Sequence, residues 1–320
     1  MTLLSDHFRR DATVGSLMGL AIGDALGTTI EFASRDQVPE VTDLVGGGPF
    51  DLQPGQWTDD TSLALCIASS LAETGAYDPI DQLERFVAWR DHGFMSSTGV
   101  CFDIGYQTSH GLDEFLRTGN PYRNNDNDRS AGNGSLMRLA PVALAFTESP
   151  AHAARLAADS SRTTHPATEC VDACFGFGWL IAVATLTRSK EAVFAAATEV
   201  ATMIKSPTIA AILGGSFKDK SRDQISSSGY VVNTLEAALW ALWVTESFEE
   251  GAVLVVNLAD DSDTVGAVYG QLAGAIYGIE AIPKRWIERV YARELIEDLA
   301  LAIYSRGGNF TVAQSAATVA

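Results

Sequence analysis

The sequence predicts an all-α fold built as one domain, on three observations. Ala, Leu and Glu recur at a spacing of three to four residues through most of the chain, which is the period of an amphipathic helix. Runs of alternating apolar and polar residues, which are typical of strands, are scarce. No linker separates two possible cores, so we expect one domain over residues 1–306 and a flexible tail over residues 307–320.

The helical period is interrupted by polar loops that are rich in Gly, Pro, Asn or Asp. These loops are expected at residues 34–57, 117–133 and 215–229. Between and beyond them, the apolar spacing predicts helices over residues 60–73, 79–91, 134–147, 150–160, 167–187, 190–204, 231–246, 263–279 and 283–304.

Glycine recurs at every fourth position in two segments far apart in the chain. The two sets are Gly15, Gly19, Gly23 and Gly27, and Gly266, Gly270, Gly274 and Gly278. Each glycine inside a helix costs roughly 0.8–1 kcal/mol relative to alanine, so the eight together cost roughly 6–8 kcal/mol. That is comparable with the whole stability of a domain, ~5–15 kcal/mol. We infer that close packing of the two helix backbones at the centre of the fold offsets this cost.

Acidic residues flank both glycine segments, so this packing would bring carboxylates together. An alternative interpretation stays open, in which the glycines serve packing alone and the neighbouring acids are incidental.

Composition limits the partners and the cell compartment. The 320 residues carry a net charge of −18, which repels nucleic-acid phosphates and anionic membranes. If the substrate is anionic, metal ions would have to neutralise the site. The apolar stretches at 14–30 and 264–279 are short and interrupted by polar residues, so neither is expected to span a bilayer.

The cysteines and the first residues indicate a cytoplasmic protein. The four cysteines, Cys66, Cys101, Cys170 and Cys174, form no CxxC pair, so we expect buried reduced thiols rather than a zinc site. The first residues contain no apolar region typical of a signal peptide. A cytoplasm that keeps thiols reduced is therefore the expected location.

Two clusters of acids and hydroxyls each stand directly before an apolar helix. The first contains Thr58, Asp59 and Asp60, and the second contains Asp261, Asp263 and Thr264. Such residues are usually helix caps, and capping alone is one interpretation of both clusters. However, adjacent acids in a first turn point in different directions and can each serve a different metal ion. Hard oxygen ligands of this kind favour Mg²⁺, Mn²⁺ or Ca²⁺ over zinc.

A fifth carboxylate could come from Glu31, which follows the first glycine segment. Asp103 follows a turn of Ser, Thr and Gly, and its alternative role is another helix cap.

A glycine-rich loop is the third element that could carry chemistry. Gly132, Asn133, Gly134 and Ser135 open an expected helix, and free N–H groups there would bind an anion such as a pyrophosphate. The alternative is a loop whose glycines satisfy turn geometry.

Two single residues complete the candidates. His165 stands at an expected helix start, where a lone histidine is more often structural than catalytic. Tyr230 follows a polar loop and could stack on a base, although a core tyrosine is the simpler interpretation.

Seven segments together resemble the ADP-ribosylglycohydrolase family, in order and over most of the chain from about Gly15 to Tyr304. The family includes the dinitrogenase-reductase-activating glycohydrolase and hydrolases of ADP-ribosylarginine and ADP-ribosylserine. The segments are GSLMGLAIGDALGTTIEF at 15–32, GQWTDDTSLAL at 55–65, CFDIGYQT at 101–108, AGNGSLMR at 131–138, SRTTHPA at 161–167, SGYVVNTLEAALWAL at 228–242 and NLADDSDTVGAVYGQLAGAIYG at 257–278.

The resemblance implies an orthogonal all-α bundle with a centre of two Mg²⁺ or Mn²⁺ ions. It implies that Glu31 and Asp103 are the catalytic acids. It assigns the phosphate to the loop of Gly132, Asn133, Gly134 and Ser135, and the adenosine-ribose part to His165 and Tyr230. The metal ligands that it implies are Thr58, Asp59, Asp60, Asp261, Asp263 and Thr264.

Two positions depart from the family pattern. Ala259 and Asp260 stand where many members have Gly-Gly, and Tyr106 stands where several have Asn. Neither removes an implied ligand, but both leave the leaving-group side of the pocket undetermined.

The implied function is hydrolysis of the N- or O-glycosidic bond between ADP-ribose and an acceptor on a protein or small molecule, with no membrane partner and no binding of duplex nucleic acid. Resemblance to the bacterial branch favours ADP-ribosylarginine, and a monomer is expected. Two other classes stay open: a catalytically silent ADP-ribose binder, and a metal phosphoesterase acting on a nucleotide diphosphate. In the favoured mechanism, two metal ions hold the distal ribose and a water, and Glu31 or Asp103 is the general acid or base.

Overall fold

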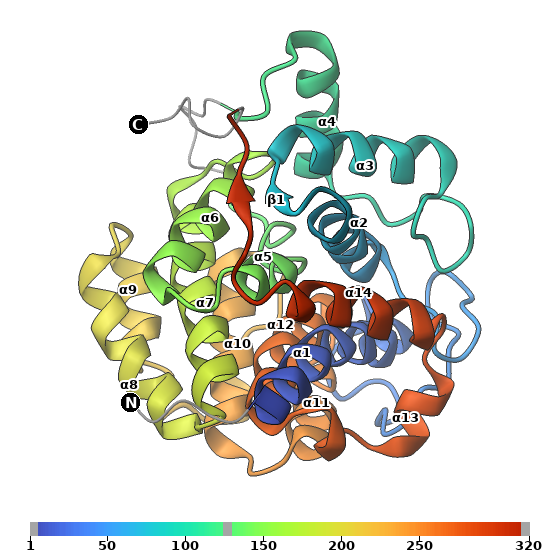
Figure 1. Ribbon diagram of the computed structural model, residues 1–320. Helices are drawn as coiled ribbons and strands as arrows, with labels where there is room; N and C mark the ends of the chain where they lie inside the picture. Colours follow the sequence, from blue (N-terminus) through green and yellow to red (C-terminus); the bar gives the residue numbers. More distant parts are fainter. Residues whose placement is uncertain (1–5, 124–129, 315–320) are drawn as a thin grey trace.

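In the computed structural model, which describes residues 6–123 and 130–314, helix α1 (Asp6–Gly27) runs antiparallel to α12 (Ser262–Tyr277) through the centre of the fold (Figure 1). A methyl group added at Gly19 would collide with the backbone carbonyl of Gly270, and one added at Gly270 would collide with that of Gly19. Gly23 and Gly266 form a second reciprocal pair. The predicted backbone packing of the two glycine helices is therefore confirmed.

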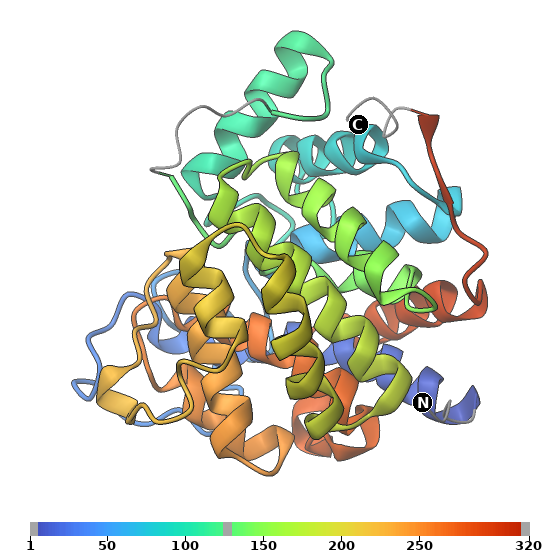
Figure 2. The same cartoon turned by 90° about the vertical axis from the view of Figure 1, so that its left-hand side faces the viewer.

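Further helices enclose this central pair. Helices α14 and α11 pack against α1 and α12, and α10 and α7 pack against α12 from another side. Helices α6 to α10 make up one half of the molecule, while α2, α3 and α4 lie at its opposite edge (Figures 1 and 2). The other helices are α2 (Asp59–Thr74), α3 (Pro79–His92), α4 (Tyr106–Thr118), α5 (Ala140–Ala145), α6 (Pro150–Arg162), α7 (Thr168–Thr187), α8 (Lys190–Val200), α9 (Pro207–Leu213), α10 (Val231–Val244), α11 (Phe248–Val256), α13 (Lys284–Arg289) and α14 (Arg293–Ser305).

Four short 3-10 helices also occur among the described residues: η1 (Thr28–Ile30), η2 (Ala201–Met203), η3 (Arg222–Gln224) and η4 (Ile279–Ala281). The all-α prediction is confirmed, since the described strands are limited to one parallel pair, β1 (Ala76–Tyr77) and β2 (Thr311–Val312).

The end of the chain is more ordered than expected. Strand β2 lies within the tail predicted from residue 307, and the buried Phe310 beside it packs against Phe146 at a ring distance of 5.7 Å. The prediction missed this because two residues of strand pairing leave no periodic pattern. Residues 315–320 of the expected tail lie outside the described residues.

Several helix predictions need correction. The expected helix 283–304 is two helices, because Ala292 between them has a φ of 43°. The expected helix 134–147 is helical only from Ala140, since residues 134–138 form turns. Helices α4, α9 and α11 were not predicted; α9 and α11 are short, and α4 begins directly after a glycine-containing loop.

Within the described residues, two helical segments are long and apolar enough to cross a membrane by length and composition alone. They are Asp6–Ile30, whose apolar window is 94% buried, and Thr168–Thr187, whose window is 78% buried. The first is longer than the stretch 14–30 that the sequence suggested. Core helices of a globular fold pass the same test, and here both lie mostly inside the protein.

Candidate active site

The two acid clusters meet where α1 ends and α12 begins. Because the two helices are antiparallel, the residues after α1 lie beside the first turn of α12, and the first turn of α2 lies there as well. Seven carboxyl groups gather at this point: Asp24, Glu31, Asp59, Asp60, Asp103, Asp261 and Asp263.

Asp24 is the member of this group that the sequence did not predict. It lies inside α1 with no exposed surface and accepts hydrogen bonds from the backbone N–H groups of Thr58 (2.9 Å) and Thr61 (3.0 Å). It also accepts a bond from the Thr61 hydroxyl at 2.6 Å. Asp24 thus caps α2 from a neighbouring helix. The signal in the sequence was an acid within an otherwise apolar helix.

Capping does not explain the two predicted clusters. Thr58 and Asp261 are the N-cap residues of α2 and α12, yet neither side chain makes a capping hydrogen bond. Instead, the Thr58 hydroxyl oxygen lies 3.0 Å from Asp24 and 3.2 Å from both Asp60 and Asp263. A hydroxyl has one proton to donate, so it cannot satisfy three carboxylates at once.

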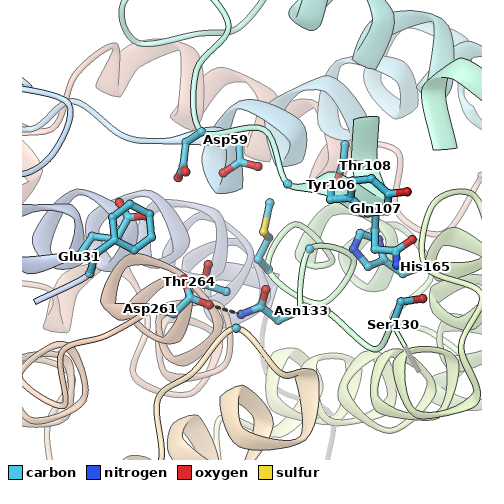
Figure 3. Close-up of a pocket in the computed structure, with 17 residues that line it drawn as sticks. Glu31, Asp59, Tyr106, Gln107, Thr108, Ser130, Asn133, His165, Asp261 and Thr264 are labelled. Carbon is cyan, nitrogen blue, oxygen red and sulfur yellow. Dashed lines mark hydrogen bonds between the residues drawn. The ribbon is translucent and has the colours of Figure 1, made fainter. Parts of the chain in front are cut away.

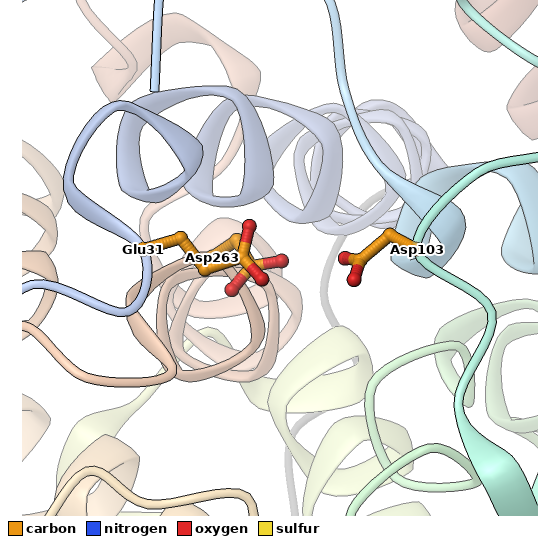
Figure 4. Close-up of side chains that lie close together, drawn as sticks. All are labelled: Glu31, Asp103 and Asp263. Carbon is orange, nitrogen blue, oxygen red and sulfur yellow. The ribbon is translucent and has the colours of Figure 1, made fainter. Parts of the chain in front are cut away.

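Several carboxylate oxygens at the site have no hydrogen-bond partner among the described residues. They are Oε2 of Glu31, Oδ1 of Asp60 and Oδ1 of Asp263, and all three are buried. Oxygens of Glu31, Asp103 and Asp263 lie within 4.8 Å of one another (Figure 4). Buried acids without partners are costly unless they are protonated or coordinate a cation.

The pKa values express the same crowding. Burial, together with the charges of Asp103, Asp261 and Asp24, raises the pKa of Glu31 to about 9. Burial, and to a smaller extent the charges of Asp261 and Asp24, raise the pKa of Asp103 to about 7. The pKa values of Asp59, Asp60 and Asp263 are also raised, first by burial and then by neighbouring carboxylates.

This set of donors fits divalent cations. Every donor is a hard oxygen, several are unpartnered, and opposing carboxylates lie close together, which is the environment that Mg²⁺ and Mn²⁺ prefer. Of the six implied ligands, Thr58, Asp60 and Asp263 are buried beneath the surface of the site. Asp59, Asp261 and Thr264 line the cavity above them.

A cavity of about 370 Å³ opens over these acids. Its wall runs from Glu31 and Asp59 at one end, past Asp261, Thr264 and Asn133, to a second end that is lined by Tyr106, Gln107, Thr108, Ser130 and His165 (Figure 3). The size falls within the range of small-molecule sites, roughly 300–1,000 Å³. The acidic end and the polar end can therefore contact different parts of one ligand.

The glycine-rich loop reaches the cavity and also contacts the acids. Asn133 donates through Nδ2 to Asp261 Oδ2 at 2.5 Å and to the Thr234 hydroxyl at 2.9 Å (Figure 3). The prediction that this loop opens a helix directly is wrong, because α5 starts only at Ala140. Gly132 and Gly134 lie on the wall, and the absence of a side chain at Gly134 leaves room for the His165 ring.

Two predicted substrate residues are not brought to the cavity wall. Ser135 is buried, and its hydroxyl bonds to that of Ser161 at 2.8 Å. The Tyr230 ring is half-exposed, and its hydroxyl donates to Glu169 Oε2 at 2.5 Å. The backbone of Tyr230 still pairs with Gly132 and so supports the loop. His165, in contrast, lies on the wall as predicted.

The wall also includes three residues at the start of α4 for which the sequence predicted no role. Tyr106 is 77% exposed and stacks on His110 at a ring distance of 5.9 Å, and Gln107 and Thr108 follow it on α4. The sequence signal was the segment 101–108, which contains all three residues and in which Tyr106 replaces the Asn of several family members.

Left-handed backbone conformations surround the acids. Ala259 and Asp260 have φ values of 61° and 60°, Asp103 has 57°, and Phe32 has 60°. The Phe32 N–H donates to the Asp260 carbonyl at 2.7 Å, and the Asp260 N–H donates to that of Ala33 at 3.0 Å. These bonds hold the two loops together. The positive φ values of Ala259 and Asp260 explain why glycine suits the two positions before the second acid cluster.

Comparisons with known proteins agree with this site. The family model described as ADP-ribosylglycohydrolase matches residues 5–310. ADP-ribosylarginine hydrolases Tri1 of Pseudomonas putida and Serratia proteamaculans are 45% and 42% identical to the chain; the alignments cover 92% and 94% of this chain and 78% and 81% of those proteins. ADP-ribosyl-[dinitrogen reductase] glycohydrolase of Rhodospirillum rubrum is 32% identical over 91% of this chain and 97% of its own.

A solved structure described as an ADP-ribosylglycohydrolase-related protein complex superposes with a TM-score of 0.82. It is 42% identical in sequence and covers 93% of this chain and 99% of that one. The fold and the site therefore define a glycosidic-bond hydrolase. The chain belongs to the ADP-ribosylglycohydrolase family.

Proposed function

We propose that the protein hydrolyses the N-glycosidic bond between ADP-ribose and an arginine side chain on a protein, with two divalent cations, Mg²⁺ or Mn²⁺, bound at the acidic end of the cavity. The observation that carries this proposal is the Thr58 hydroxyl, which faces three carboxylates with one proton, while one buried oxygen each of Asp60 and Asp263 has no hydrogen-bond partner in the described part of the chain. Such a site is electrostatically incomplete without cations.

The charge balance supports two cations rather than one. Seven carboxyl groups gather at the site, and two divalent ions contribute four positive charges. When bound, these ions supply Lewis-acid polarisation of sugar and water oxygens. Thr58, Asp59, Asp60, Asp261, Asp263 and Thr264 would hold them.

The protein's own residues carry the proton transfers. In the overall reaction, the C–N bond at the anomeric carbon breaks, a water oxygen bonds to that carbon, and the leaving nitrogen gains a proton. Glu31 and Asp103 have oxygens within 4.8 Å of one another, and burial and the charge of Asp103 raise the pKa of Glu31 to about 9. One protonated and one ionised carboxyl group can therefore share the acid and base roles.

The arginine linkage is supported by the relatives from Pseudomonas putida and Serratia proteamaculans, which are 45% and 42% identical and are both named ADP-ribosylarginine hydrolases. It also suits the charge of the site, since a cationic guanidinium group is attracted to an acidic cavity. The loop of Gly132 and Gly134 and the ring of His165 lie at the other end, where the diphosphate and adenosine would be bound.

The test is release of free ADP-ribose from matched ADP-ribosylarginine and ADP-ribosylserine peptides. We expect release from the arginine peptide with Mg²⁺ or Mn²⁺ and none with EDTA. The Asp59→Ala and Asp261→Ala variants should show no turnover. AMP as the product would identify a phosphoesterase instead, and ADP-ribose binding without any release would identify a silent binder. Full activity of both variants would contradict the proposed site.

A further inference from the structure

The polar end of the cavity is supported by a buried arginine that the proposed reaction does not use. Arg138 has no exposed surface, and its guanidinium carbon lies 4.5 Å from the centre of the Phe86 ring. Its Nη2 donates to the hydroxyl oxygen of Thr164 at 2.7 Å. The same hydroxyl oxygen lies 2.7 Å from Nδ1 of His165. The three side chains thus form a continuous chain of hydrogen bonds that ends at the cavity wall.

The direction of the protons in this chain follows from the chemistry of its members. A guanidinium group only donates, so the Thr164 oxygen accepts from Arg138. The Thr164 hydroxyl then has its own proton to donate. Among the described residues, His165 Nδ1 is the acceptor that the hydroxyl contacts. The arrangement in which the Thr164 hydroxyl both accepts from Arg138 and donates to His165 therefore leaves Nδ1 without a proton and puts the ring proton on Nε2.

The Nε2 edge of His165 faces the glycine-rich loop. A β-carbon added at Gly134 would lie 2.8 Å from Cε1 and 3.0 Å from Nε2, and one added at Gly132 would lie 3.7 Å from Nε2. No described residue accepts a hydrogen bond from Nε2, and the ring lines the cavity (Figure 3). Its N–H group is thus presented beside the loop.

We propose that Arg138 and Thr164 are positioning residues that hold His165 as the neutral Nε2–H tautomer, which donates a hydrogen bond to an anionic oxygen of the substrate. The inference rests on the proposed function for the identity of this oxygen, which is the diphosphate of ADP-ribose. A fixed donor contributes because it does not have to reorient when the ligand binds.

The surroundings favour a neutral ring over an imidazolium. Burial lowers the pKa of His165 well below its usual value, and the charges of Arg138 and Arg123 lower it further. Arg123 Nη1 donates to the Thr164 carbonyl at 2.7 Å, so both cations contact the residue next to His165.

Two substitutions at Thr164 and one at its neighbour test the proposal. Thr164→Val removes the hydroxyl, while Thr164→Ser keeps it. Thr163→Val is the matched control, because Thr163 is equally buried and its hydroxyl bonds only locally, to the Ser160 carbonyl at 2.7 Å. The tautomer is measured from the ¹⁵N shifts of ¹⁵N-histidine-labelled full-length protein, with the His165 signal assigned from the spectrum of His165→Gln.

The wild type and Thr164→Ser should show His165 with Nε2 protonated and Nδ1 unprotonated at neutral pH. Thr164→Val should lose this single tautomer and bind ADP-ribose about tenfold more weakly by calorimetry, with KM raised more than kcat is lowered. Thr163→Val should match the wild type in both measurements.

A protonated Nδ1 in the wild type, or an unchanged tautomer in Thr164→Val, would overturn the inference. Equal losses of ADP-ribose affinity in Thr164→Val and Thr163→Val would reduce Thr164 to a structural residue. Failure of the proposed function has a different signature, which is no ADP-ribose release by the wild type. The tautomer and the ADP-ribose affinity decide the present inference in that case too.

Discussion

Helices α1 and α12 meet in two regions, a seam of glycines and a cluster of acids. Along the glycine seam, defined by Gly15–Gly27 on α1 and Gly266–Gly274 on α12, the two backbones are in contact and no space remains for a side chain. A few residues beyond, the same helices bring together carboxyl groups, three of which have one buried oxygen with no hydrogen-bond partner among the described residues. The seam is closely packed by the protein alone, whereas the acidic end has buried oxygens that the proposed cations would bind.

This difference teaches how the fold supports the site. Close backbone packing fixes the end of α1 against the start of α12, and so it holds mutually repelling acids in place. Substitutions in the seam should therefore lower the stability of the protein. Substitutions of the acids should lower its activity and raise its stability, because they reduce repulsion between carboxylates.

The largest expected effect comes from neutralising a buried acid. Asp60→Asn and Asp263→Asn should each reduce release of ADP-ribose from an arginine peptide on the order of a thousandfold, because in the proposed mechanism the cations that they hold supply several kcal/mol of transition-state stabilisation. The same variants should melt at a higher temperature than the wild type in EDTA, since a buried charge is removed. Asp298→Asn, at an exposed position on α14, is the matched control and should change neither quantity.

The next largest effect is expected in the seam. Gly270→Ala places a methyl group against the Gly19 carbonyl, and overpacking of this kind costs about 3 kcal/mol or more when neither backbone can move. Urea unfolding should show the loss. Gly214→Ala is the control, because Gly214 has a φ of −71° and an added carbon would come no closer than 3.2 Å to the nearest atoms. Equal stability of the two variants would refute a tightly packed seam.

The pH dependence of stability should reflect the crowding of carboxyl groups at the acidic end. The folded pKa values of Glu31 and Asp103, about 9 and about 7, lie above the ordinary values of 4.5 and 3.8. The folded state therefore binds more protons than the unfolded state between these limits, and stability falls as pH rises. In EDTA, the melting temperature should drop from pH 5 to pH 9. Mn²⁺ should raise the melting temperature most near pH 9, because at lower pH the cation has to displace protons from the carboxyl groups. A flat profile in EDTA would count against the crowded acids.

The smallest effect is expected at the strained loop before α12. Ala259→Gly should stabilise the protein by about 0.5–1 kcal/mol, because a left-handed conformation costs alanine more than glycine. Thermal unfolding at saturating Mn²⁺ would measure it, with Ala273→Gly, inside α12, expected to destabilise instead. A loss of stability in Ala259→Gly would show that the conformation is not strained.

The sequence predicted the seam well, because glycine at every fourth position is costly in a helix and close packing is the evident compensation. It also predicted which acids meet. It missed Asp24, since one acid in an apolar helix does not reveal which backbone N–H groups it contacts. The outward turn of the Tyr230 ring and the burial of Ser135 depend on tertiary partners, Glu169 and Ser161, that no local pattern indicates.

The most direct test of the central claim is to count the cations and follow activity in the same samples. Protein stripped with EDTA would be titrated with Mn²⁺ by calorimetry, and release of ADP-ribose from an arginine peptide would be measured at each point. We predict two bound ions per chain and activity that rises as the sites fill, with no binding to Asp60→Asn at the same concentrations. Full activity in the stripped protein, or no Mn²⁺ binding by the wild type, would contradict the account.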